Sequence, residues 1–263
     1  MEITIDGRRC EARADETVLE VARREDIYIP TFCHHEALEA FNACRVCLVA
    51  VEQNGQRALL PSCSLKVEDG MEVETDAEDV ARTRKVVLEL LLARCPEVEK
   101  VQELAAEYGV TEPEFEVTDA QEDCILCGLC VRVCDELIGA QALAFSQRGT
   151  DTVVETPFEE PSDVCIGCGA CAEVCPTGHI TVEDKADGTR EIVPFHTSHT
   201  LVPCPRCGTG YVTEKQLEFL EEQLGEKSDI LASCPQCREK EQAGRLHDLY
   251  EKMAPIESQR EEI

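Results

Sequence analysis

The sequence is poor in aromatic residues: they make up 4% of its 263 residues, and tryptophan is absent. This scarcity argues against one large core anchored by aromatic side chains and favours several small cores held together by other means. No apolar run approaches the length of a membrane-spanning helix, and the start, MEITIDGRRC, contains no apolar signal segment. We therefore expect a cytoplasmic protein that does not insert into a membrane.

Positive charge is also scarce, because 25 lysines and arginines stand against 54 acidic residues, for a formal net charge of −29. Such a chain would repel the phosphates of nucleic acids and an anionic membrane surface. An acidic balance of this size suits docking onto protein partners through complementary charge, and it suits solubility alone equally well. The charge therefore predicts no nucleic-acid partner.

Cysteine, in contrast, is abundant, with 18 residues. In a secreted chain this number would indicate disulfides, but without a secretion signal it indicates metal binding. The length predicts two to four small units rather than one domain.

The clearest motif is a duplicated cysteine run, CILCGLCVRVC from residue 124 and CIGCGACAEVC from residue 165. In each run a C-x2-C-x2-C loop surrounds three corners of a [4Fe–4S] cluster, and in two-cluster ferredoxins the fourth cysteine binds the other run's cluster. Two complete runs argue against the alternatives, eight structural thiols or an array of zinc sites. The predicted ligand sets are Cys124, Cys127, Cys130 and Cys175 for one cluster, and Cys165, Cys168, Cys171 and Cys134 for the other.

The first 76 residues follow the element order of a β-grasp ferredoxin domain, an α+β fold. The predicted elements are strands at 2–5 and 8–12, a helix at 17–25, and strands at 46–51 and 71–75. Helical periodicity then runs from residue 76 to about residue 108, with Pro96 as an interruption and Gly109 as the end.

A further four cysteines lie in this first part of the chain: Cys33, Cys44, Cys47 and Cys63. Plant-type [2Fe–2S] ferredoxins use C-x4-C-x2-C with a distant fourth cysteine. Ten residues separate Cys33 from Cys44, so the plant spacing is not met.

The longer spacing, the segments ACRVC, PSC and DGMEVET, and both runs with Asp135 in place of proline resemble a known family over roughly residues 1–190. It comprises the iron–sulfur subunits of the complex I electron-input arm and the diaphorase subunits of NAD-linked hydrogenases and formate dehydrogenases. The resemblance implies a [2Fe–2S] cluster on the four N-terminal cysteines and two [4Fe–4S] clusters, which relay electrons between a flavin subunit and a catalytic subunit.

The chain departs from that family at one place. Members usually carry an additional cluster, bound by one histidine and three cysteines, after the long helix, where this chain offers only Cys95. We predict that this cluster is absent and that Cys95 and Cys10 are small buried residues. His34 and His35 follow a ligand, and the alternatives for them are hydrogen bonding to a cluster or plain exposure.

The C-terminal region contains two C-P-x-C knuckles that place four thiolates as a tetrahedral metal site needs them: Cys204, Cys207, Cys234 and Cys237. Structural zinc, rubredoxin-like iron, a further cluster and empty thiols all stay open, with zinc the commonest occupant. The turn KADG at 185–188 predicts a hairpin before this region. The segment between the knuckles has a helical pattern, near 213–224, and a last helix rich in Glu and Lys is predicted after the second knuckle. His196 and His199 are weak substitute ligands.

The sequence also lacks a G-x-G-x-x-G after a strand, a phosphate-binding loop and a defensible Ser/His/Asp arrangement. No substrate pocket follows from it. We therefore predict four parts: a [2Fe–2S] domain at 1–76, a helical linker at 77–112, a two-[4Fe–4S] ferredoxin-like domain at 113–194, and a small helical four-cysteine region at 195–263.

These features are interpreted as a non-catalytic electron-transfer subunit of an oxidoreductase complex. It would relay electrons between a flavin- and NAD(P)-binding subunit and a hydrogenase or formate dehydrogenase module; an electron-bifurcating assembly with free ferredoxin is one form of such a complex. The alternatives are a free-standing multi-cluster ferredoxin shuttle, a self-sufficient enzyme with a catalytic C-terminal region, and an interaction protein with structural metals.

Overall fold

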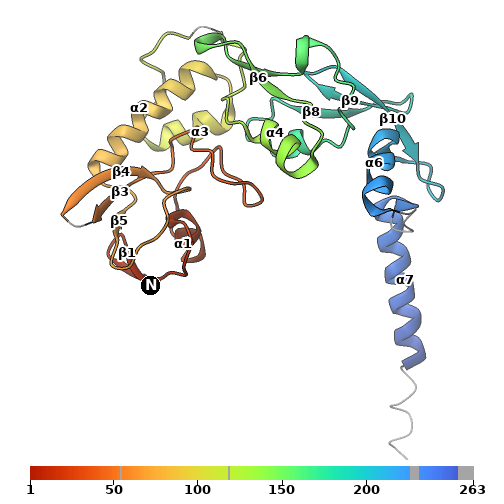
Figure 1. Cartoon of the computed structure of the whole chain (residues 1–263), viewed down its shortest axis with the longest axis horizontal. Helices are drawn as coiled ribbons and strands as arrows, with labels where there is room; N and C mark the ends of the chain where they lie inside the picture. Colours follow the sequence, from red (N-terminus) through yellow and green to blue (C-terminus); the bar gives the residue numbers. More distant parts are fainter. Residues whose placement is uncertain (54, 118, 226–230, 254–263) are drawn as a thin grey trace, which may run out of the picture. The chain divides into compact units, whose positions relative to one another are not determined.

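The structure, a computed structural model, describes the chain except residues 54, 118, 226–230 and 254–263 (Figure 1). It contains two compact units. Unit 1 comprises Met1–Glu160 and Ala170–Thr181, and unit 2 comprises Pro161–Gly169 and Val182–Ile263. No helix among the described residues combines the length and the apolar character that a bilayer crossing requires.

Unit 1 begins with a five-stranded sheet in the order β2-β1-β5-β3-β4, in which β1 and β5 are parallel and the other pairs are antiparallel. The strands are β1 (Glu2–Ile5), β2 (Arg8–Glu11), β3 (Leu48–Gln53), β4 (Gln56–Pro61) and β5 (Glu72–Glu74). The predicted strands are confirmed to within a few residues. The structure adds β4, which the sequence analysis missed because its side chains are mostly exposed and its sequence, QRALLP, shows no alternation of apolar and polar residues.

Helix α1 (Val18–Arg24) is short but capped at its start. The Thr17 hydroxyl accepts from the backbone N–H of Glu20, and the Glu20 carboxylate accepts from the backbone N–H of Thr17, a capping box that satisfies two terminal donors. The buried face of α1 packs in one apolar cluster with Ile3, Ile5 and Val49 of the sheet. This packing holds the loop that follows α1, which carries the first two predicted ligands.

Two helices cover the next part of unit 1, α2 (Glu78–Arg94) and α3 (Glu99–Glu107), and they lie side by side (Figure 1). The break falls around Pro96, and Gly109 ends α3 with a φ of +70°, as predicted. Arg84 of α2 is 2% exposed and donates to the carbonyls of Val46, Leu48 and Thr75 at 2.8, 2.7 and 3.2 Å. This buried guanidinium fastens the helices to the ferredoxin sheet.

The rest of unit 1 consists of short elements around the first cysteine run and the end of the second. They are α4 (Leu129–Arg132), a π-helical turn η1 (Val133–Ile138), β6 (Ala144–Ser146), η2 (Gly149–Asp151), β7 (Val153–Glu155), η3 (Pro157–Glu159) and α5 (Ala170–Glu173). Strands β6 and β7 pair as an antiparallel hairpin that the sequence did not predict.

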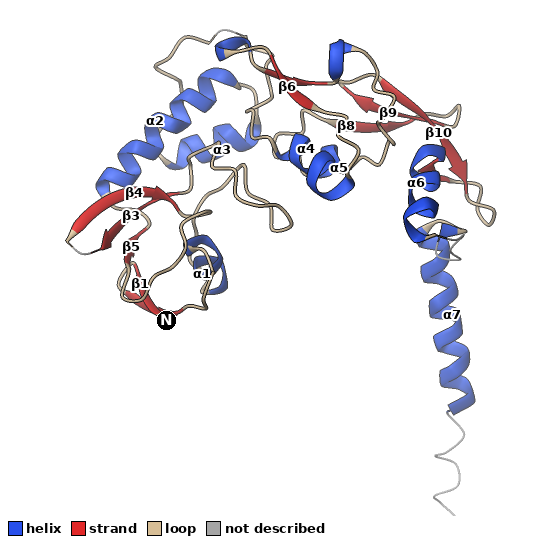
Figure 2. Cartoon of the chain, in the orientation of Figure 1, coloured by secondary structure: helices blue, strands red, loops and turns tan. Residues whose placement is uncertain are grey.

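Unit 2 contains a four-stranded sheet in the order β11-β10-β9-β8. Three of its strands, β8, β9 and β10, are labelled in Figure 2. Its elements are β8 (Thr181–Asp184), β9 (Thr189–Val193), β10 (Thr197–Pro203), β11 (Gly210–Thr213), α6 (Glu214–Leu224) and α7 (Pro235–Met253). The predicted turn at 185–188 joins β8 to β9, and both C-terminal helices are present.

The prediction that residues 195–263 form a small helical region is only partly right. The region from residue 195 onward is not wholly helical, because β10 and β11 form an antiparallel hairpin around the first C-P-x-C knuckle. The segment between the knuckles therefore starts with a strand before α6 begins. Residues on both sides of 194 belong to one sheet, so the predicted ranges divide the chain by motif rather than by sheet.

Candidate iron–sulfur and metal centres

The four N-terminal cysteines converge from two places in the fold. Cys33 and Cys44 lie in the loop after α1, Cys47 directly precedes β3, and Cys63 follows β4. All four are buried, with at most 7% exposure.

The four thiols form two close pairs. The Sγ atoms of Cys47 and Cys63 are 3.5 Å apart, and the Cys44 backbone N–H donates to Cys33 Sγ at 3.4 Å. Hydrogen bonding within the pairs lowers the pKa of Cys44 to about 6 and that of Cys47 to about 7, while it raises the pKa of Cys33 and Cys63. Each pair thus readily holds a thiolate, the form that binds iron.

The spacing of this set fits a cluster better than a single ion. Among the described residues, no three of these sulfurs belong to a group whose ligand atoms all lie within 4.8 Å of one another. Two separate pairs of thiolates suit a cluster of two irons, for which four cysteines are the usual ligands.

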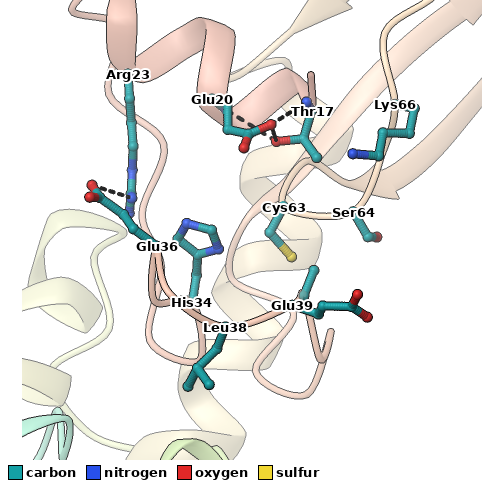
Figure 3. Close-up of a pocket in the computed structure, with 11 residues that line it drawn as sticks. Thr17, Glu20, Arg23, His34, Glu36, Leu38, Glu39, Cys63, Ser64 and Lys66 are labelled. Atoms are coloured by element: carbon teal, nitrogen blue, oxygen red, sulfur yellow. Dashed lines mark hydrogen bonds and ion pairs between the residues drawn. The ribbon is translucent and has the colours of Figure 1, made fainter. Parts of the chain in front are cut away.

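A pocket of about 620 Å³ opens beside Cys63 and is lined by charged residues from α1 and the following loop (Figure 3). His34 lines the same pocket, and its Nδ1 is buried without a hydrogen-bond partner among the described residues. Burial, and then the charge of Arg23, lowers the pKa of His34. His35 is exposed and accepts from the Ala37 backbone N–H at 3.2 Å, so only His34 lies by the candidate site.

The long loop between Cys33 and Cys44 also reaches the first cysteine run. Phe41 of this loop stacks on Phe145 of β6, with ring centroids 6.3 Å apart, and the Arg132 guanidinium lies 5.5 Å from the Phe41 ring centre. A Cβ added to Gly128 would lie 2.9 Å from Phe41 Cε1. The extra loop length therefore packs one predicted cluster site against the next.

The first cubane set lies wholly in unit 1. Cys127 and Cys130 are 7% exposed, and burial raises the pKa of both thiols, to about 11 for Cys127. Burial is the largest cause that raises the pKa of Cys124 and Cys127, and a backbone hydrogen bond to each thiol lowers it. The charge of Cys175 is a smaller cause that raises the pKa of both. Cys175 thus lies near the first run, but the charge of Cys171 likewise raises the pKa of Cys130, so the exchange of fourth ligands stays a prediction.

Cys175 differs electrostatically from the thiols of the first run. Burial would raise its pKa, but the Ile180 backbone N–H and the Thr177 hydroxyl hydrogen-bond with it and lower the pKa. The Thr177 Oγ1 lies 3.5 Å from Cys175 Sγ. This sulfur is therefore already placed to carry negative charge.

A group of polar side chains that the sequence analysis missed lies beside Cys124 and Cys175. Glu122, Asp123 and His179 have ligand atoms within 4.8 Å of one another, and His179 Nδ1 hydrogen-bonds with the Asp123 carboxylate. The pair joins the residue before Cys124 to the loop after Cys175. No sequence signal pointed to it, because the two segments are far apart in the chain.

The residues of the second cubane set are divided between the two units. In unit 1, Cys134 lies in η1 and accepts from the Ala142 backbone N–H at 3.3 Å, and Cys171 lies in α5. In unit 2, Cys165 accepts from the Gly167 backbone N–H at 3.4 Å. Cys134, Cys165, Cys168 and Cys171 are all half-buried.

Side chains of the unit 2 sheet and of α6 hold the loop from Asp163 to Cys168. Lys215 Nζ donates to the Asp163 carbonyl at 2.7 Å, and Thr213 Oγ1 donates to the Ile166 carbonyl. His199 packs against Gly167; burial, and then the charges of Lys215 and Arg190, lowers its pKa, so the ring is neutral near neutral pH.

The sulfur atoms of the four C-terminal cysteines lie close together. All four Sγ atoms, of Cys204, Cys207, Cys234 and Cys237, lie within 4.8 Å of one another, and those of Cys207 and Cys234 are 3.7 Å apart. A Zn–S bond of about 2.3 Å implies sulfurs about 3.8 Å apart in a tetrahedron. This set therefore fits one tetrahedral ion. His196 is exposed and pairs with Glu191, and neither His196 nor His199 belongs to the four-ligand group found in the described residues.

Backbone bonds prepare these thiols for a cation. The Cys234 backbone N–H donates to Cys204 Sγ at 3.4 Å, and this bond is the first cause that lowers the pKa of Cys204 to about 6. Cys95 contrasts with them: it is fully buried, and burial raises its pKa to about 12. Its burial, and that of Cys10, confirms that part of the prediction.

Comparison with known families finds the two cluster types. Residues 1–78 match the 2Fe-2S iron–sulfur cluster binding domain, and residues 161–181 match the 4Fe-4S binding domain. The chain thus contains both domain types within an α+β architecture, together with a four-cysteine site at residues 204–237.

Sequence similarity to individual proteins covers more of the chain than the two domain matches do. The chain is 36% identical, over 80% of its length, to an NADH-quinone oxidoreductase subunit of Rhizobium meliloti, and covers 27% of that protein. It is 36% identical, over 67% of its length, to the HndD subunit of the NADP-reducing hydrogenase of Solidesulfovibrio fructosivorans, and covers 35% of it. The chain therefore spans about a third or less of these relatives.

A solved structure is also similar. A chain from the crystal structure of an NAD⁺-reducing [NiFe]-hydrogenase in the H2-reduced state superposes with a TM-score of 0.57 at 29% sequence identity. The match covers 67% of this chain and 85% of that one.

Proposed function

Because the chain belongs to the family of iron–sulfur subunits found in NADH-quinone oxidoreductases and NAD(P)-linked hydrogenases, we propose that it is an electron-transfer subunit of such a complex. Its partners are a flavin- and NAD(P)-binding subunit and a hydrogenase or formate dehydrogenase catalytic subunit. Free ferredoxin is a further partner if the complex is electron-bifurcating. The chain itself makes and breaks no substrate bonds, and it works in the cytoplasm.

Twelve cysteines bind the clusters in this proposal. Cys33, Cys44, Cys47 and Cys63 hold one [2Fe–2S] cluster; Cys124, Cys127, Cys130 and Cys175 hold one [4Fe–4S] cluster; and Cys165, Cys168, Cys171 and Cys134 hold the other. When bound, such clusters supply one-electron redox chemistry. The protein supplies their positions, their exclusion from water and the hydrogen bonds around them.

The observation that carries the proposal is the shared packing of the first two sites. Cys33, Cys44 and Cys127 belong to one buried apolar cluster, and Phe41 packs against Gly128 of the first run. A relay needs its centres close together and shielded from water, and the shared packing of these cysteines supports such an arrangement. A free ferredoxin shuttle is the alternative.

For the C-terminal site, we propose that Cys204, Cys207, Cys234 and Cys237 bind one zinc ion. The compact sulfur spacing supports a single tetrahedral ion over a further cluster. Single iron in the same four thiolates is the competing occupant.

The test is anaerobic purification of the protein with whatever chains accompany it, followed by metal and sulfide analysis. We expect about ten irons for one [2Fe–2S] and two [4Fe–4S] clusters, about one zinc, and co-purifying flavin and catalytic subunits. Clearly fewer irons in a preparation with intact sulfide would show a wrongly assigned site. Iron in place of zinc at the last site would refute its assignment, and a monodisperse single chain would favour the shuttle.

A further inference from the structure

One buried polar atom in unit 2 has no role in the proposal so far. His199 is 6% exposed, and its Nε2 has no hydrogen-bond partner among the described residues. Buried polar side-chain atoms in native proteins nearly always have a partner. The atom therefore indicates a partner that protein atoms alone do not provide.

The ring lies against the second run's loop. A Cβ added to Gly167 would lie 2.6 Å from Cδ2 and 2.8 Å from Cγ of His199, and Gly167 has a φ of +68°. Only a residue without a side chain allows the ring to approach this closely. Gly167 lies between Cys165 and Cys168, so the Cδ2–Cγ edge of the ring lies against the loop that carries two predicted cluster ligands, and Nε2 is the ring atom next to Cδ2.

The neighbouring strand fixes His199 in place. His199 of β10 is the register partner of Arg190 of β9, so both side chains point to the same face of the sheet. Arg190 donates to both carboxylate oxygens of Asp184 at 2.7 and 2.9 Å, and its Nη1 lies 3.5 Å from the Gly167 carbonyl.

Three backbone carbonyls of this loop already accept hydrogen bonds from side chains. The carbonyls of Asp163, Ile166 and Gly167 accept from Lys215, Thr213 and Arg190. A bound cluster would add further acceptors here, its inorganic sulfides and the cysteine sulfurs that hold it.

We propose that His199 donates a hydrogen bond through Nε2 to a sulfur of the cluster bound by Cys165 and Cys168, and thereby raises its reduction potential. The inference rests on the proposed function, because it needs a cluster at the second run. Reduction adds negative charge to the cluster and its sulfurs, and a donor stabilises that charge. His199 is thus a positioning and tuning residue rather than a ligand.

If His199 donates this hydrogen bond, the two [4Fe–4S] clusters should have different reduction potentials. The side chains of Arg190 and His199 lie by the second run. The first run is buried instead, and the Glu122 carboxylate adds negative charge near Cys124. The second-run cluster therefore has the higher potential, and electrons reside on it in preference to the first.

The test compares His199→Phe, which keeps a ring but loses the donor, with His199→Gln, which keeps a donor. Anaerobic redox titration followed by electron paramagnetic resonance gives the midpoint potential of each cluster. In His199→Phe we expect one cubane to shift by about tenfold in its reduced-to-oxidised ratio, about 59 mV for one electron, toward lower potential. His199→Gln should retain a large part of the potential, and the matched control His196→Phe, at an exposed histidine, should change neither cubane.

A second measurement keeps the inference testable if His199→Phe does not fold. In protein labelled with ¹⁵N-histidine, pulsed resonance of the reduced second-run cluster should detect a nitrogen coupling that His199→Gln removes. Unchanged potentials with full iron content, or an unaltered nitrogen coupling in His199→Gln, would overturn the inference and leave the proposed function standing. Wild-type protein that holds no second cubane would instead refute the proposed function.

Discussion

The two cysteine runs have the same sequence frame, CI-x-CG-x-C-x-x-VC, but the fold surrounds them differently. In the first run, Ile125, Leu129 and Val133 are buried in the core of unit 1 with Cys127 and Cys130. The corresponding positions of the second run are all half-buried, and its first loop meets polar side chains of a sheet.

This difference teaches that spacing and environment are separate properties of a cluster site. Four thiolates at the right intervals are enough to bind a cubane, whereas burial, nearby charge and hydrogen bonds to sulfur set its potential. A duplicated motif therefore does not imply duplicated behaviour.

The largest expected effect comes from the exchanged fourth ligands. If Cys134 binds the second-run cluster, Cys134→Ala should damage that cluster and convert it to a three-iron form on mild oxidation, while Cys175→Ala should damage the first. Paramagnetic spectra of both variants, compared with Cys127→Ala and Cys168→Ala, identify which cluster is altered. A Cys134→Ala spectrum that matches the Cys127→Ala spectrum would mean that the four cysteines of each run bind the same cluster.

The next effect concerns the C-terminal metal site. Cys204→Ala should release the zinc and unfold the surrounding part of unit 2, since structural zinc sites of this kind supply folding free energy directly. Because Thr213 and Lys215 hold the second run's loop, the second-run cluster should be lost faster than the first. Zinc analysis and the rates of cluster loss in air check this, with Cys10→Ala as the control. Equal loss of both cubanes would contradict the expected asymmetry.

A smaller effect is expected at the paired glycines. Gly128→Ala and Gly167→Ala both place a Cβ at a positive φ and within 3 Å of a ring, of Phe41 and His199 respectively. Each should lower the free energy of unfolding by about 2 to 4 kcal/mol. Gly128→Ala should change the signals of the first cubane and of the [2Fe–2S] cluster, and Gly167→Ala only those of the second.

Denaturant titrations and resonance spectra of the same samples measure both consequences. Gly70→Ala is a suitable control, because Gly70 also has a positive φ but no described atom lies within 4 Å of an added Cβ. It should destabilise less and leave all cluster signals unchanged.

The smallest effect is expected at Cys95, which lies near the first run but outside its predicted ligands. Cys95→Ser should keep the iron content and every paramagnetic signal, and should cost about 1 to 2 kcal/mol because a hydroxyl is buried in an apolar core. Iron analysis and thermal unfolding check this. Disappearance of a distinct cluster signal would reveal a ligand role.

Local signals account for the parts that sequence analysis predicted well. The capped helix after Thr17, the break at Pro96, the glycine end of α3 and the turn before Gly188 each depend on a few adjacent residues. The missed elements, β4 and the two hairpins β6–β7 and β10–β11, show no clear alternation of apolar and polar residues in their sequences. Pairing with a neighbouring strand and packing of the paired side chains stabilise them, rather than a residue pattern within one strand.

The sequence by itself determined the ligand types and their spacing, because thiolates within a run are separated by a few residues of backbone that any tight loop can bend. Only the tertiary structure decided what surrounds those thiolates. It brought Phe41 against Gly128 and His199 against Gly167, and it buried one run more deeply than the other. Such contacts join segments far apart in the chain, and the free energy that selects them comes from packing, which no local pattern encodes.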